Sequence, residues 1–220
     1  AFAGIFSMII ELSDRYIIKL IFDTDSVGLY NAGYKLGALM LLIVMAFNMA
    51  WQPFFLNKKN HNKELIGSIS NSMFLFFSLV CFFIICFGQP LASIKVFGYS
   101  FVGDDFAGGI SILPWICAGY LFHSAYILQL PGAYITNNTV SVAKIRGVGA
   151  LFNVALNFIL IPALGIHGAA ISTFISFVLI SVLLFTHNKR IYPIKYDMYS
   201  VFILIGTLIA LIGVIGYNPS

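Results

Sequence analysis

The chain has 220 residues, of which 60% are hydrophobic and only 9% are charged. Soluble globular domains carry about 25% charged residues, so this composition excludes a soluble domain and predicts an integral membrane protein. The formal net charge is +4, but basic residues in a membrane protein report its orientation first, and no nucleic-acid partner is expected.

Long apolar runs recur along the whole chain. A transmembrane helix needs about 20 mainly apolar residues. The runs lack the alternation of apolar and polar residues that is typical of barrel strands, so the predicted fold is all-α. Turns between spans are expected at Pro131–Gly132, Pro162 and Gly165. The sequence predicts about seven transmembrane helices, at residues 2–22, 28–56, 65–88, 110–130, 142–161, 165–186 and 198–217.

Lys and Arg alternate between the two sides of these spans. The connections at 57–64, 131–146 and 187–197 are rich in basic residues, whereas the opposite connections hold only Lys95. Basic loops stay in the cytoplasm, so residue 1 is predicted to be cytoplasmic and the C-terminus to lie outside. The eight basic residues on the cytoplasmic side are Lys58, Lys59, Lys63, Lys144, Arg146, Lys189, Arg190 and Lys195.

Four charges interrupt the first span, at Glu11, Asp14, Arg15 and Lys19. At 100° per residue they occupy one arc of about 140°. Each central charge facing lipid would cost about 2.5–3.5 kcal/mol, so the arc must face other helices or water. Two interpretations stay open. Glu11 and Arg15 could form an ion pair that joins helices, or the arc could line an aqueous cavity for a charged solute.

Further polar residues in the second and fifth spans extend this arc. Asn31 and Lys35 are spaced i,i+4 beside Tyr34, and "GYKLG" provides two glycines for close helix approach. Cations in a low-dielectric cavity favour anionic solutes such as phosphates. Glu11 and Asp14 are assigned to a charge network or a coupling-ion site, and no catalytic residue, metal site or cofactor is expected. The candidate substrate-cavity residues are Arg15, Lys19, Lys35, Asn31, Tyr34, Arg146, Asn153 and Asn157.

Two stretches carry a family resemblance. "DRYIIKLIFDTDSVGLYNAGYKLGALM" followed by "AFNMAWQPFF", and later "NVALNFILIPALGIHGAAISTFISFVLISVLLF", resemble the C-terminal lobe of Wzx-type polysaccharide flippases. These belong to the multidrug/oligosaccharidyl-lipid/polysaccharide exporter superfamily. The resemblance implies two six-helix lobes around a central cavity. Residues 1–187 would then form the second lobe and 188–220 one additional helix, with the N-terminal lobe absent from this chain, which we expect to be part of a longer protein.

The same resemblance implies a function. Such flippases move undecaprenyl-diphosphate-linked oligosaccharides across the bacterial inner membrane during synthesis of lipopolysaccharide, capsule or exopolysaccharide. The implied partners are that lipid-linked oligosaccharide, membrane lipid, the missing lobe, and possible polymerase and glycosyltransferase neighbours. The implied activity is transport, not enzymatic catalysis.

Three alternatives stay open. A drug or organic-cation antiporter of the same superfamily would share the fold, with Glu11 and Asp14 binding a proton or sodium. A membrane glycosyltransferase or glycan polymerase would place its chemistry on a long loop, and the outer connection at 89–109 offers only Lys95, Asp104 and Asp105. A structural membrane module is the third alternative.

Overall fold

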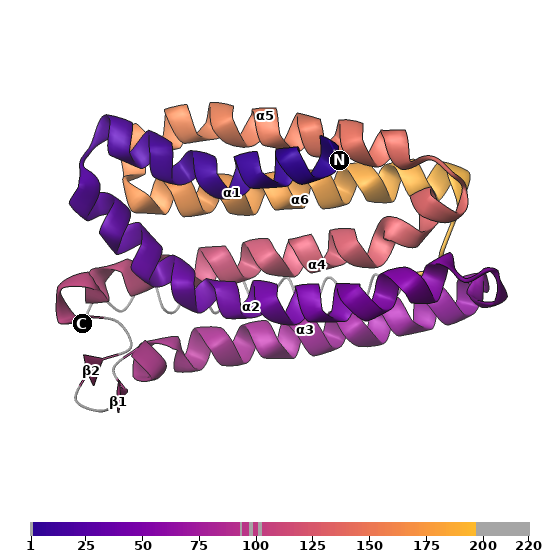
Figure 1. Ribbon diagram of the computed structural model, residues 1–220, viewed down its shortest axis with the longest axis horizontal. Helices are drawn as coiled ribbons and strands as arrows, with labels where there is room; N and C mark the ends of the chain where they lie inside the picture. The colour runs from indigo at the N-terminus through magenta and orange to yellow at the C-terminus, as the bar shows by residue number, and fades with distance from the viewer. Residues whose placement is uncertain (1, 93, 97–98, 101–102, 197–220) are drawn as a thin grey trace.

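The computed structural model describes residues 2–92, 94–96, 99–100 and 103–196 (Figure 1). Long helices dominate this part of the chain, and the first six predicted spans correspond one to one with α1 to α6. The seventh predicted span, 198–217, lies outside the described residues. The elements are α1 (Phe2–Ile21), α2 (Thr24–Leu56), η1 (Lys58–Asn60), α3 (Lys63–Ala92), β1 (Lys95–Val96), β2 (Tyr99–Ser100), η2 (Asp104–Ile112), α4 (Leu113–Ile135), α5 (Thr139–Leu164) and α6 (Ile166–Ile191).

Five of the described helical segments, those containing α2 to α6, are long and apolar enough to cross a membrane. α1 has 20 residues, but its four charged side chains set it apart from the other five. The protein is an all-α, multi-pass membrane protein. The connection predicted at 89–109 is shorter than expected, because the helical elements on either side of it extend into that range. α3 continues to Ala92 and η2 begins at Asp104, with the small β1–β2 hairpin between them.

The turns predicted at Pro131–Gly132 and at Pro162 were wrong, because both helices continue through their prolines. α4 continues through Pro131 and Gly132 to Ile135, and α5 continues through Pro162 to Leu164. Membrane helices tolerate proline where neighbours satisfy the freed backbone groups. α6 packs against this part of α4, where Nδ2 of Asn188 donates to the Gln129 carbonyl at 2.6 Å. The turn between α5 and α6 is made by Gly165 alone, with φ of +59°.

The helices form two groups, which Figure 1 shows as an upper layer of α1, α5 and α6 and a lower layer of α2, α3 and α4. Within the groups, α5 packs on α1 and α6, and α4 packs on α2 and α3; the α4–α6 contact joins the two groups. α4 is central, and most of its side chains are buried. We call the boundary where α1 and α5 face α2 and α4 the seam.

The glycines of "GYKLG" make the close helix approach that the sequence predicts. A Cβ atom on Gly33 would lie 2.0 Å from the carbonyl oxygen of Gly109 in η2, and one on Gly37 would lie 2.3 Å from Cγ2 of Ile116 in α4. Only glycine allows these backbones to come so near. The contact fixes the start of α2 against η2 and α4, and therefore fixes one wall of the seam.

Candidate functional site

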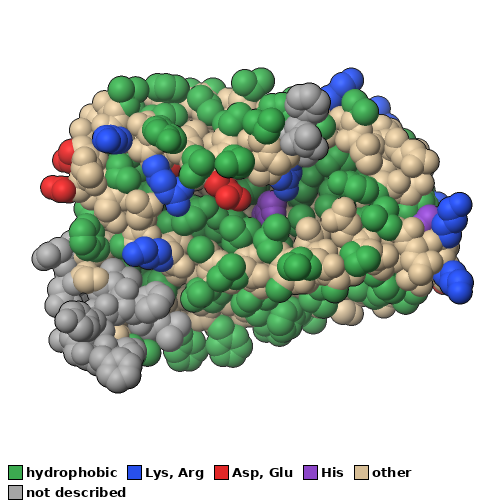
Figure 2. Space-filling model, in the orientation of Figure 1, with side chains coloured by type: hydrophobic (Ala, Val, Ile, Leu, Met, Phe, Trp, Pro, Cys, Tyr) green, Lys and Arg blue, Asp and Glu red, His purple; other side chains and the backbone are tan. Residues whose placement is uncertain are grey.

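The joint between α1 and α2 turns the charged side of α1 toward the start of α2. Asp23 caps α2, its carboxylate accepting the Ser26 backbone N–H at 2.7 Å. From this joint the two helices diverge into different layers (Figure 1). Figure 2 shows basic, acidic and histidine side chains in a band across the middle of an otherwise largely apolar face.

A pocket of about 370 Å³ opens at the end of the seam near this joint. It brings together four of the predicted cavity residues, Arg15 from α1 and Asn31, Tyr34 and Lys35 from α2. We call this pocket the groove. Its remaining lining comes from small and aromatic residues of α2 and of the segment around η2, namely Gly28, Ala32, Gly103 and Phe106.

Arg15 is held in the groove by contacts with three other residues. Its Nε donates to Oδ1 of Asn31 at 2.7 Å, and Nη1 donates to the backbone carbonyl of Glu11. Its guanidinium carbon lies 4.3 Å from the centroid of the Tyr34 ring, a cation–π distance. No carboxylate among the described residues forms a salt bridge with Arg15, so the Glu11–Arg15 ion pair, one of the two interpretations left open by the sequence, is not seen. The guanidinium is thus oriented by an amide oxygen, a backbone carbonyl and an aromatic ring.

Arg146 repeats this arrangement further along the seam. It projects from α5, and its guanidinium carbon lies 4.6 Å from the centroid of the Tyr126 ring of α4. Glu11 of α1 interacts electrostatically with both Arg146 and Arg15. Two arginines from one layer therefore stack on tyrosines of the other layer. Glu11, on the same side of the seam as both arginines, is half-buried.

Asp14 lies elsewhere, at the centre of a buried hydrogen-bond network. Its side chain has 0% exposure. Tyr30 of α2 and Thr173 of α6 donate to Oδ2 at 2.6 and 2.7 Å, and Asn157 of α5 donates to Oδ1 at 2.7 Å. Each donor comes from a different helix. The carboxylate thus ties α1 to three other helices through neutral donors.

The predicted asparagine stripe of α5 belongs to this network and not to the groove. Asn153 and Asn157 both have 0% exposure. Oδ1 of Asn153 accepts from Ser13 of α1 at 2.9 Å and from Asn157 at 3.2 Å. Lys19, at the end of α1, is exposed and is not part of the groove lining. The structure thus divides the predicted cavity residues among the groove, the seam, the buried network and the surface.

Several members of these clusters, among them Tyr30, Thr173 and Tyr120, were not among the predicted site residues. Tyr30 and Thr173 donate to Asp14, and the hydroxyl of Tyr120 in α4 forms a hydrogen bond with that of Tyr34. Tyr30 stands next to Asn31 in the sequence, so its proximity to a predicted site residue could have identified it. Thr173 and Tyr120 stand in apolar runs, and nothing in their sequence context connects them to α1 or α2. Among the described residues, no group of three or more His, Cys, Asp and Glu side chains could hold a metal ion.

Comparison with known proteins gives one informative similarity. No protein-family model matches the chain, and no solved structure matches it. The chain is 25% identical over 186 residues to the probable low-salt glycan biosynthesis flippase Agl15 of Haloferax volcanii, and the match covers 84% of this chain. It covers 39% of the relative, so the chain spans about two fifths of that protein's length. By sequence, the chain is similar to a protein described as a flippase of glycan biosynthesis.

Proposed function

We propose that the chain is one lobe of a membrane flippase that moves a lipid-linked glycan from one leaflet to the other. The observation that carries this proposal is the groove, in which Arg15 and Lys35 face one pocket with no described carboxylate paired to either. Similarity to a glycan biosynthesis flippase supports a transporter over a catalyst. Residues 1–187 would form the lobe, and residues 188–220 would add a further helix.

The groove suits an anionic part of the cargo. Hydrogen bonds to a charged group contribute about 1.5–3 kcal/mol each, and a guanidinium bound along one edge and stacked on a ring is well oriented for phosphate oxygens. Arg146 offers a second cation deeper in the seam. In the proposed function the seam faces a second lobe, and the diphosphate of the lipid carrier is held first by one arginine and then by the other.

The finer parts of the proposal come from the family resemblance. The carrier would be undecaprenyl diphosphate, the membrane would be the bacterial inner membrane, and the basic connections would lie in the cytoplasm. A polymerase and glycosyltransferases would act before or after this protein on the same glycan. Since alternating access needs two repeats that move against each other, residues 1–220 expressed alone should not restore glycan export to a strain that lacks its flippase.

The test is glycan export by the intact protein in such a strain. Arg15→Gln and Lys35→Gln should each weaken binding of the anion roughly 10- to 100-fold, because each removes one charge-assisted interaction. Export should fall while membrane abundance stays normal. Arg15→Lys keeps the charge but loses the planar fork, so partial export is expected. The control is Lys59→Gln, which removes an exposed charge far from the groove. Normal export by both groove variants would refute the proposal.

Asp14 supports a second candidate, a cation-coupled antiporter of the same superfamily. Its carboxylate is buried with no cationic hydrogen-bond partner, as a proton or sodium site would require. Glu11 is separate from it, on the seam. Transport of organic cations that depends on a sodium or proton gradient, and that is lost in Asp14→Asn while Arg15→Gln leaves it intact, would favour the antiporter over the flippase.

A further inference from the structure

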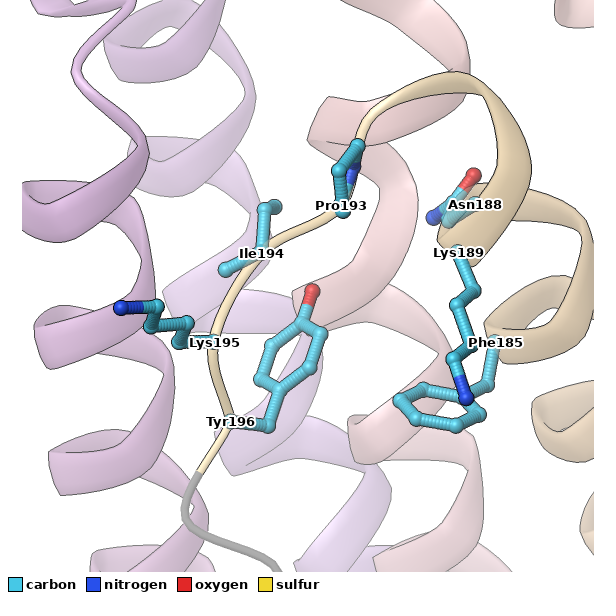
Figure 3. Close-up of a pocket in the computed structure, with 7 residues that line it drawn as sticks. All are labelled: Phe185, Asn188, Lys189, Pro193, Ile194, Lys195 and Tyr196. Carbon is cyan, nitrogen blue, oxygen red and sulfur yellow. The ribbon is translucent and has the colours of Figure 1, made fainter.

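A second pocket lies at the opposite end of the bundle, between the end of α6 and the segment that follows it. Its volume is about 410 Å³. Figure 3 shows Lys189 and Phe185 on the α6 side and Tyr196 facing them from the other side, with Pro193 and Ile194 above. Asn188 completes the α6 wall, while Lys195 extends from the far side of the segment. The walls are mainly apolar, and polar groups lie at particular points.

This end of the molecule carries a strong positive charge. It contains the connections between α2 and α3 and between α4 and α5, together with the end of α6. Glu64 is the one acidic residue of these connections and their flanking turns within the described chain. Since α2, α3, α4, α5 and α6 all begin or end here, this end lies where a bilayer changes from hydrocarbon to headgroups. Basic pockets between helix ends at this depth attract anionic lipid headgroups. The basic residues are Lys58, Lys59, Lys63, Lys144, Lys189, Arg190 and Lys195.

The pocket also contains a polar group that lacks a partner. The hydroxyl of Tyr196 is buried and has no hydrogen-bond partner among the described residues. Buried hydroxyls almost always have a hydrogen-bond partner. An unpaired hydroxyl that lines a pocket therefore points to a ligand that would accept a hydrogen bond from it. Asn188 already donates through Nδ2 to the Gln129 carbonyl, and its Oδ1, which has no partner among the described residues, is an acceptor and cannot bind an anion. Tyr196 and Lys189 are therefore the groups that can reach an incoming anion.

We propose that this pocket binds the headgroup of an anionic glycerophospholipid of the surrounding leaflet. The phosphate lies between the Lys189 ammonium and the Tyr196 hydroxyl, which donates to it, and the start of an acyl chain lies against Phe185 and Ile194. Free phosphate would satisfy the two polar groups but would leave the apolar walls facing water. The combination of one cation, one donor and an apolar wall fits a lipid better than a soluble anion. This site is distinct from the groove and does not depend on the proposed transport.

The experiment uses the intact protein in nanodiscs that contain equal amounts of phosphatidylglycerol and phosphatidylcholine. Native mass spectrometry measures which lipid stays bound after release from the disc. The parent protein should retain phosphatidylglycerol in preference. Lys189→Gln and Tyr196→Phe should each lower the ratio of the two retained lipids by roughly tenfold, because each loses one interaction with the phosphate. Lys59→Gln, at the same basic end but outside the pocket, should keep the parental ratio.

Several results would overturn the proposal. One is an equal loss in Lys59→Gln, which would indicate a diffuse charge effect. Another is an unchanged ratio in both pocket variants. A third is complete displacement of the lipid by excess inorganic phosphate, which would assign the pocket to a soluble anion. Folding is checked in phosphatidylcholine alone, where Tyr196→Phe should be at least as thermally stable as the parent because it removes only an unpaired hydroxyl.

Discussion

Arg15 and Tyr34 meet across the seam, with the guanidinium carbon of Arg15 4.3 Å from the centroid of the Tyr34 ring. The same tyrosine joins α2 to α4 through the hydroxyl of Tyr120. The ring and the hydroxyl of Tyr34 thus make separate contacts. The ring orients the cation of the groove, and the hydroxyl holds α2 against the central helix.

Substitutions of Tyr34 should separate these two contacts. Tyr34→Phe keeps the ring over Arg15 and loses only the bond to Tyr120, so transport should persist with a somewhat less stable protein. Tyr34→Leu removes the cation–π contact, worth about 0.5–2 kcal/mol, and transport should fall further. Export and thermal stability measured on both variants check this. Equal export by the two variants would show that the ring does not orient Arg15.

Asp14 should be essential for folding, whatever its part in transport. Asp14→Ala leaves the hydroxyls of Tyr30 and Thr173 without their acceptor, while the Asn157 amide keeps its bond to Asn153. Each buried unsatisfied donor costs about 1–3 kcal/mol, so a loss of about 2 kcal/mol or more is expected. Asp14→Asn keeps one acceptor oxygen and should be intermediate. Thermal unfolding in detergent measures the effect, with Asp25→Ala as the control because Asp25 is an exposed carboxylate. Parental stability in Asp14→Ala would contradict this role.

The sequence predicted α1 to α6, because long apolar runs and the cost of an unsatisfied backbone in lipid leave only helices. It also predicted that Arg15, Asn31 and Lys35 would share one site. It assigned Asp14 to a charge network or a coupling-ion site, and it did not predict that neutral donors from three other helices would surround this carboxylate. Asp14 and Arg15 are about 100° apart on the helix. One polar arc can therefore contain both a side chain that points into the protein interior and one that lies at the seam. Which one turns inward depends on Asn157 and Thr173, and their distance from α1 cannot be read from a helical wheel.

Gly33 should not tolerate even one added methyl group. A Cβ there would lie 2.0 Å from a backbone oxygen of η2, and backbone moves away less easily than a side chain. Gly33→Ala should therefore separate α2 from η2 and cost about 1–3 kcal/mol, as overpacking does. Gly4→Ala is the matched control, because nothing lies within 4 Å of a Cβ at Gly4. Equal unfolding temperatures for the two variants would disprove the close contact.

The proposed orientation can be tested from both sides of the membrane. Lys59 and Asp25 are exposed and lie at opposite ends of α2. In a background without Cys81, Cys86 and Cys117, Lys59→Cys should react with an impermeant maleimide only from the cytoplasm, and Asp25→Cys only from outside. The reverse pattern would invert the protein and move the groove to the cytoplasmic side. Reaction of both positions from one side would mean that α2 does not cross.

The buried carboxylate and its three donors also lead to an expectation about sequence variation among relatives. Asp14 accepts from Tyr30, Asn157 and Thr173, and loss of any one of these four polar groups removes at least one buried hydrogen bond. Across relatives the four positions should therefore change as a set. A lineage that replaces the carboxylate with an apolar residue should also have lost the tyrosine hydroxyl, the amide and the threonine, although these lie on four different helices.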